Sequence, residues 1–208
     1  LLVRAAQVPN KVAPRPVAPA RKRAPTGVAA EAIKAFNDGN LARARDLLQG
    51  ATGEEARTLD TQIEEFQRTY EAGLAEHRGK RAFNAIKLLT QAKGLEAKIS
   101  GESKQAPIID AKLADMYYVL GMQAYLAQKL PEAAEDFRTA VNLAPDHALS
   151  SRKLTELEQK SRDMLAEALE VKGSDTAKAR ALLQTVVEMG FTAGDVSKRA
   201  KKALDALK

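Results

Sequence analysis

The chain has 208 residues, of which 45% are hydrophobic, 29% are charged and only 4% are aromatic. It contains no cysteine, which excludes disulfides and thiolate metal sites, and it has no apolar run long enough to span a bilayer. This length allows one elongated domain or two small ones, and no run of alternating β-branched residues predicts a sheet.

The net charge of +6 is concentrated in residues 1–26, which hold six basic residues and no acidic one. The rest of the chain has 33 − 6 = 27 basic and 27 acidic residues, so it is formally neutral. Five of the eight prolines also lie in this segment, and they favour extended, polyproline-like backbone. The high isoelectric point therefore belongs to this tail and gives no evidence for a basic groove elsewhere.

Several roles remain open for residues 1–26. The segment could be a semi-rigid linker, a strand that docks on a partner, a juxtamembrane segment drawn to anionic lipid, or an arm that binds nucleic acid. The last is the least favoured, because no aromatic side chains are interleaved for base stacking. The opening Leu-Leu-Val could also end a membrane helix or signal segment. As docking contacts in this tail we expect Arg15, Arg21, Lys22 and Arg23.

Residues 28–51 predict a first helical hairpin that turns at Gly39 and Asn40. A long helix is expected over residues 54–79, because apolar residues recur there at spacings of three and four. Its partner helix over residues 80–93 is expected to point four residues inward: Phe83, Ile86, Leu89 and Ala92. Glycine, serine and proline gather in residues 94–107, which predicts a loop.

Residues 114–147 carry the most specific pattern in the chain. They predict two helices, with Pro131 in the first turn of the second helix and Pro145 just past its end. Small residues at Gly121 and Ala133 let the helices approach closely, while Phe137 fills the seam together with Leu120. This stretch resembles a tetratricopeptide repeat, which spans 34 residues. The matching positions are Tyr117, Leu120, Gly121, Ala133, Phe137, Ala140 and Pro145.

The C-terminal part predicts another long helix over residues 147–172, a turn at Gly173-Ser174-Asp175 and a helix that ends at Gly190. A final helix over residues 194–207 has lysines outward and is expected to cap the array. The corresponding alanines of the four hairpins are separated by 41, 48 and 46 residues: Ala44, Ala85, Ala133 and Ala179. Since these spacings exceed 34, either the first helices are lengthened or the loops carry insertions.

Little in the sequence points to catalysis. The two histidines, His77 and His147, are far apart in the chain, and His147 is expected to be an exposed neighbour of a helix cap. The glycines mark turns and helix ends rather than a phosphate-binding loop. The acidic residues are interspersed with lysine and arginine on helix faces. We therefore expect no enzyme activity, no cofactor and no metal site.

The resemblance implies a concave groove lined by the first helix of each repeat. At the matching positions of the most specific repeat stand Tyr118, Met122 and Tyr125, and the weaker repeats add Phe36, Tyr70 and His77. Aromatic and methionine side chains at such positions suit an apolar peptide, extended or helical. The alternative is that these side chains pack between helices.

These observations predict an all-α fold over residues 27–208, a tetratricopeptide-like superhelix of about four helical hairpins plus a C-terminal capping helix. The expected function is a non-enzymatic scaffold that binds a protein or peptide partner. Alternatives are a soluble platform of a membrane-anchored bacterial envelope machine for secretion or pilus assembly, and binding of anionic lipid or nucleic acid through the tail. Frequent alanine and arginine weakly favour a bacterial origin.

Overall fold

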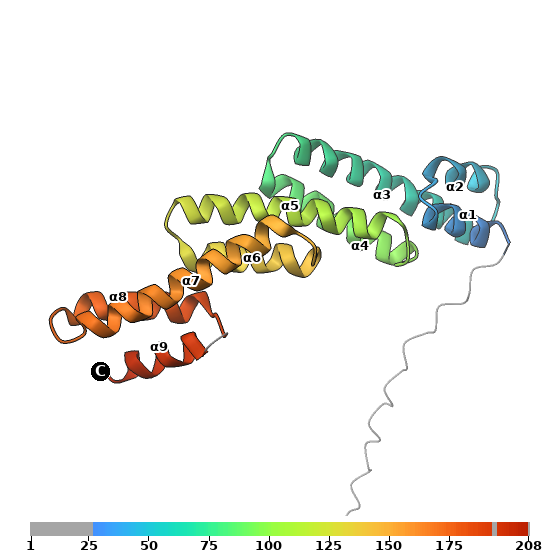
Figure 1. Cartoon of the computed structure of the whole chain (residues 1–208). Helices are drawn as coiled ribbons and strands as arrows, with labels where there is room; N and C mark the ends of the chain where they lie inside the picture. Colours follow the sequence, from blue (N-terminus) through green and yellow to red (C-terminus); the bar gives the residue numbers. More distant parts are fainter. Residues whose placement is uncertain (1–26, 193–194, 208) are drawn as a thin grey trace, which may run out of the picture.

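The computed structural model describes residues 27–192 and 195–207, and in that part of the chain every regular element is an α-helix. The helices form an elongated array in which each packs chiefly on its neighbours in sequence (Figure 1). Their bounds are α1 Val28–Asn37, α2 Leu41–Leu48, α3 Glu54–Arg78, α4 Ala82–Ile99, α5 Gln105–Leu126, α6 Leu130–Leu143, α7 Ala148–Val171, α8 Thr176–Met189 and α9 Val196–Asp205. The predicted all-α fold of four hairpins and an end helix is therefore confirmed. Residues 1–26, with their predicted docking arginines and lysine, lie outside the described residues.

The hairpins exceed an ordinary repeat because their first helices are long. Helices α3, α5 and α7 have 25, 22 and 24 residues. The alternative of long loops is thereby excluded for residues 94–107, where a loop was predicted. Instead α4 continues to Ile99 and α5 starts at Gln105. The extension is stabilised because Leu95 and Ile99, one helical turn apart, are both buried in the N-terminal core.

A buried carboxylate organises the short connection that remains. Glu96 is 3% exposed, and its Oε1 accepts a hydrogen bond from the Ser103 backbone N–H at 3.0 Å. The connection also rests on the first hairpin, because the Lys104 N–H donates to the Asn37 carbonyl oxygen at 2.9 Å. Glycine and serine in this segment thus form a compact turn between two helices rather than an insertion.

The first three hairpins share one turn geometry. Gly39, Lys80 and Gln128 occupy corresponding positions with φ of 83°, 52° and 60°. In each turn the N–H of that residue donates to the carbonyl three residues back, at 2.9, 3.0 and 3.1 Å. The next N–H donates to the carbonyl five residues back, at 2.9, 3.0 and 2.9 Å. This is the hydrogen-bonding pattern of a Schellman motif, which ends a helix with one left-handed residue.

The helices within a hairpin approach closely at a glycine. A Cβ added to Gly121 would lie 2.6 Å from Cε1 of Phe137, a fully buried ring. A Cβ added to Gly73 would lie 2.9 Å from Cδ2 of Leu89 in the corresponding position of the α3–α4 hairpin. The predicted seam between small and large residues is therefore present, with Phe137 as its filler. Leu120, which was expected to share this role, instead packs toward α4 beside Ala82, Ala85 and Met116.

The prediction that Phe83 points inward was wrong. Its side chain is 82% exposed, while Ala82 and Ala85 on the same helix are buried. Ala82 and Ala85 cluster with Met116 of α5, so the small residues of α4 fill this interface and the larger Phe83 falls on its flank.

Buried side chains form two principal cores along the array. One joins α1 through α4 to the first half of α5, and the other joins the end of α5 to α6 through α9. Both consist of residues from position 29 onward, so residues 27–208 contain the whole of each described core.

Candidate functional site: the first-helix face

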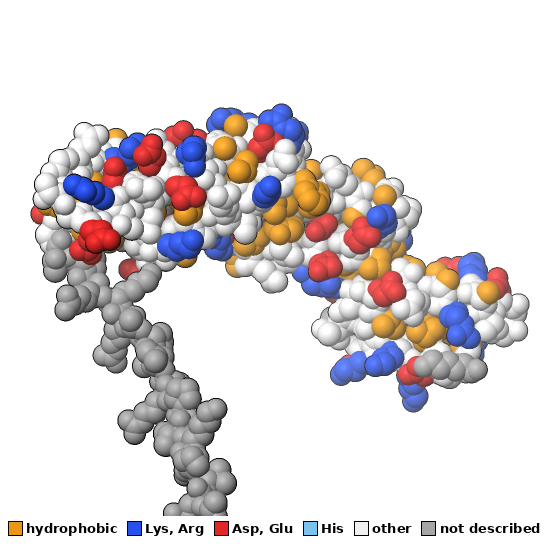
Figure 2. Space-filling model, turned by 180° about the vertical axis from the view of Figure 1, so that it is seen from behind, with side chains coloured by type: hydrophobic (Ala, Val, Ile, Leu, Met, Phe, Trp, Pro, Cys, Tyr) orange, Lys and Arg blue, Asp and Glu red, His pale blue; other side chains and the backbone are white. Residues whose placement is uncertain are grey.

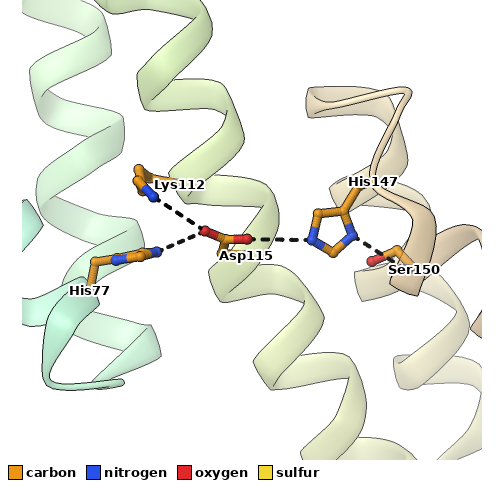
Figure 3. A network of polar contacts seen from close by, with 5 residues as sticks. All are labelled: His77, Lys112, Asp115, His147 and Ser150. Carbon is orange, nitrogen blue, oxygen red and sulfur yellow. Dashed lines mark hydrogen bonds and ion pairs between the residues drawn. The ribbon is translucent and has the colours of Figure 1, made fainter.

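The first helices of the last three hairpins, α3, α5 and α7, meet at a single carboxylate. Asp115 lies midway along α5 and contacts both histidines of the chain, His77 near the end of α3 and His147 before α7 (Figure 3). We call the surface that these three helices share around Asp115 the first-helix face. Its position across three hairpins makes it the best candidate for a functional site.

The contacts of Asp115 use both carboxylate oxygens. His77 Nε2 lies 3.0 Å from Oδ2, and His147 Nε2 lies 3.5 Å from Oδ1. Lys112, one turn earlier on α5, places its Nζ 3.7 Å from Oδ2. The side chains of His77 and His147 are 17% and 13% exposed, whereas that of Asp115 is 44% exposed. The network is thus half open to solvent at its centre and shielded at both ends.

His147 also caps a helix, which corrects the expectation of an exposed residue. Its Nδ1 accepts a hydrogen bond from the Ser150 backbone N–H at 3.3 Å, so His147 is the N-cap of α7. A neutral imidazole that accepts at Nδ1 carries its proton on Nε2. The Nε2–H group is therefore the donor that faces Asp115, and one ring links the start of α7 to the middle of α5.

Although Ser150, His147 and Asp115 have the residue types of a catalytic triad, their geometry is that of a helix cap. The histidine contacts the backbone N–H of Ser150 and not its hydroxyl. Ser150 is fully buried, and its Oγ makes no hydrogen bond within the described part of the chain. A nucleophile needs a base at its hydroxyl and access to substrate, and Ser150 has neither.

The predicted groove residues of α5 are partly buried against the C-terminal core: Tyr118, Met122 and Tyr125. The Tyr118 ring lies 5.8 Å from that of Phe137 and 5.7 Å from that of His147, measured between centroids. Two lysines of α7 approach the Tyr125 ring, with Lys153 Nζ 5.1 Å and Lys160 Nζ 5.7 Å from its centroid. All three residues keep some exposed surface, and Tyr118 lies next to His147 of the Asp115 network.

Of the other two aromatic positions, Phe36 is buried in the core and Tyr70 is partly exposed. Phe36 is fully buried, and its ring meets the edge of Phe66 at 5.1 Å, so its assignment to the groove was wrong. Tyr70 stacks on Phe66 at 5.5 Å, and burial raises the pKa of its hydroxyl. Helix α1 has only 10 residues, so its single large aromatic is needed in the core.

Sequence reasoning named His77 but missed Asp115, Lys153 and Lys160. The two lysines stand seven residues apart and so share a face of α7, and this spacing could have been read from the sequence. Nothing local marks Asp115, because its partner His77 is 38 residues away.

The described residues provide no site for a metal and no membrane span. No group of three or more His, Asp or Glu side chains within residues 27–192 and 195–207 is arranged to hold a metal ion. In the same ranges, no helix has both the length and the hydropathy needed to cross a bilayer. Comparison of the chain with protein family models, with curated proteins and with solved structures finds no significant match.

Proposed function

We propose that this protein is a non-enzymatic scaffold of tetratricopeptide-like hairpins that binds a segment of a partner protein on its first-helix face. The observation that carries the proposal is the convergence of α3, α5 and α7 on Asp115. A half-exposed carboxylate stands there, Tyr118 packs on its partner His147, and partly exposed Met122 and Tyr125 follow on the same helix. Long helices joined by repeated turns offer a rigid, extended surface, and such arrays present continuous binding faces.

The partner that suits this face is an apolar peptide with polar groups at defined positions. Met122 and Tyr125 supply adaptable apolar contact, and aromatic side chains are frequent anchors in interfaces. Asp115 and Lys112 offer an acceptor and a donor one helical turn apart. The lysines beside Tyr125 add a cationic rim. Affinity would come from the apolar contacts, and register would come from the charged pair.

The test is site-specific photo-cross-linking in the native lysate. The chain would carry a photoreactive residue at position 112 or 122 on the first-helix face. The matched control has it at Lys87, an exposed position of α4 beside Phe83. We expect the same partner to be cross-linked from 112 and 122 but not from 87, with bait 1–208 and bait 27–208 alike.

Two results would contradict the proposal. Cross-linking from position 87 alone would place partner binding elsewhere on the array. Loss of the partner with bait 27–208 would assign binding to the tail instead of the first-helix face.

A further inference from the structure

A second surface of the molecule is apolar, open and unrelated to the first-helix face. Phe83 and Ile86 of α4, with Tyr117 and Leu120 of α5, line a hollow of about 380 Å³. A phenylalanine with 82% of its surface exposed is unusual in a chain with few aromatics. The space-filling view shows hydrophobic side chains gathered near the middle of the molecule (Figure 2).

The hollow continues toward α6, where its character changes. Phe83 and Leu120 also line an adjoining hollow of about 380 Å³ that reaches Glu132 and Asp136 of α6. We call the two hollows together the α4–α6 groove. Its apolar end is flanked by two aromatic rings and its other end by carboxylates.

Asp136 is the unusual group of this groove. It is partly buried, and burial together with neighbouring Glu135 and Glu132 raises its pKa to about 6. Within the described part of the chain it makes no hydrogen bond or ion pair. The nearby lysine, Lys129, pairs with Glu132 at 3.2 Å. An unpaired carboxylate at the edge of an apolar groove favours a ligand that carries a cationic side chain on an apolar segment.

The chain itself contains a segment of that chemistry. Residues 1–26 hold six basic residues, five prolines and no acid. Pro14 and Pro16 flank Arg15, and Pro9 stands two residues before Lys11, so the basic residues farthest from Gly27 are set among prolines that favour polyproline II backbone. Proline-rich segments bind grooves lined by aromatic side chains, and an arginine beside them can pair with an acid at the rim. The proline-rich backbone of the segment therefore suits the aromatic end of the groove, and its positive charge suits the acidic end.

The length of the tail allows this contact within one molecule. Ala29 and Ile33 of α1 line a hollow with Glu54 and Leu59, so α1 starts beside the start of α3. Phe83 follows the other end of α3, whose 25 residues span about 37 Å at 1.5 Å per residue. Arg15 and Lys11 are 12 and 16 residues from Gly27 and reach about 40 and about 53 Å in extended backbone, so Arg15 arrives at the Phe83 end of the groove and Lys11 can pass beyond it. Arg21, Lys22 and Arg23 are too near Gly27 to reach the groove.

We propose that the proline-rich, basic segment of residues 1–26 docks in the α4–α6 groove of its own chain, with proline side chains against Phe83 and Tyr117 and with Arg15 or Lys11 paired to Asp136. Docking there would tether the tail along the array and cover Phe83, the most exposed aromatic side chain among the described residues. The inference is independent of the proposed function, since it concerns a different surface.

A single fluorophore tests the proposal in the full-length protein. Because the chain has no cysteine, Lys87→Cys creates a unique attachment point beside the groove for an environment-sensitive dye. We expect a blue-shifted emission in the chain of residues 1–208 that is lost in residues 27–208. Reversing the charges of Lys11 and Arg15 to Glu should abolish the shift, whereas the same reversal at Arg21 and Arg23 should leave most of it. Equal spectra for 1–208 and 27–208 would overturn the proposal.

Titration of a synthetic peptide of residues 1–26 into chain 27–208 measures the groove directly. Phe83→Ala should weaken binding about tenfold, the loss expected for one aromatic anchor, and Asp136→Asn should weaken it by a similar factor. Leu149→Ala, at a residue 55% exposed on α7, is the matched control and should leave affinity unchanged.

Because Phe83 is so exposed, its truncation should not unfold the array, and thermal melting of each variant checks this. Unaltered affinity of the Phe83→Ala variant would overturn the proposal. The proposal would also be overturned if the blue shift of chain 1–208 appeared only at concentrations where the chain dimerises. The groove would then be occupied by a second copy of the chain.

Discussion

One helix, α6, borders two seams of the array that differ in how they are closed. Toward α8, Arg138 donates a hydrogen bond from Nη2 to the Met189 carbonyl oxygen, and its guanidinium lies 4.9 Å from the Phe191 ring centroid. Toward α4, two residues earlier, Asp136 has no such contact within the described chain, and Phe83 stays exposed. Arg138 closes its seam because its guanidinium finds a backbone acceptor and a ring, whereas the Asp136 carboxylate finds no donor among the described residues and its seam stays open.

The difference also decides what each seam can do. Burial lowers the pKa of the Arg138 guanidinium, yet the hydrogen bond and the aromatic ring offset the cost of placing a cation there. The α6–α8 seam therefore contributes to stability. The α4–α6 groove carries an uncompensated carboxylate, which makes it a site for binding rather than for folding.

The largest effect is expected where α6 meets α5, because this contact positions both seams. In Gly121→Ala the new Cβ would collide with the buried Phe137 ring. We expect a loss of about 2–3 kcal/mol in the free energy of unfolding, measured by urea denaturation. Gly73→Ala is the matched variant, and we expect a smaller cost because its Cβ would lie 2.9 Å from Leu89 Cδ2, a less severe overlap than 2.6 Å from the Phe137 ring. Equal losses would show that the ring moves as readily as the leucine.

Arg138→Ala should weaken the α6–α8 seam and lower the free energy of unfolding by about 2 kcal/mol. The substitution removes a charged donor and leaves the Met189 carbonyl unpaired. Urea denaturation measures it, with Arg152→Ala as control. The side chain of Arg152 is 80% exposed and pairs with Glu156 on the surface, so its loss should cost less than about 0.5 kcal/mol. If the two variants lost the same free energy of unfolding, Arg138 would not stabilise the α6–α8 seam.

The turns that lead into the two seams should respond differently to glycine. Gln128, before α6, has φ of 60°, a conformation that glycine adopts without strain. Gln128→Gly should therefore raise the free energy of unfolding by about 0.5–1 kcal/mol. Ser174, in the turn before α8, does not have a positive φ, so Ser174→Gly should bring no gain. Thermal melting of both variants checks the contrast, and a gain at Ser174 would contradict it.

The pH dependence of stability should report on Asp136. Its folded-state pKa of about 6 lies above the ordinary 3.8, so the folded protein binds the proton more tightly than the unfolded chain does. Asp136 therefore lowers stability above pH 6, and this loss disappears as the pH falls toward 4. Asp136→Asn should stabilise the chain of residues 27–208 at pH 7 and flatten this part of its profile. Urea denaturation at a series of pH values measures the difference between variant and parent.

The same measurement on residues 1–208 sharpens the comparison. If the basic tail pairs with Asp136, the carboxylate is compensated and Asp136→Asn should gain less stability than it does in residues 27–208. A gain of equal size in both chains would show that Asp136 stays uncompensated in the full-length protein.

The sequence by itself determined where most helices lie and how several of them begin and end. Pro131 opens α6, the Asp175 side chain caps α8, and Gly190 ends α8 in the left-handed conformation. The packing of Gly121 on Phe137 was also predictable. These signals act between residues on the same or the next helix, so spacing alone reveals them.

Only the tertiary structure decided which face of α4 is buried, how far that helix extends and where the histidines meet. The buried stripe of α4 is rich in alanine, and Ala82 and Ala85 pack with Met116 of α5, so the size of Phe83 pointed to the wrong face. Leu95 extends α4 because a core formed with α1 and α3 receives it. His77, Asp115 and His147 belong to three hairpins, and only the stacking of whole helices brings their side chains to one place.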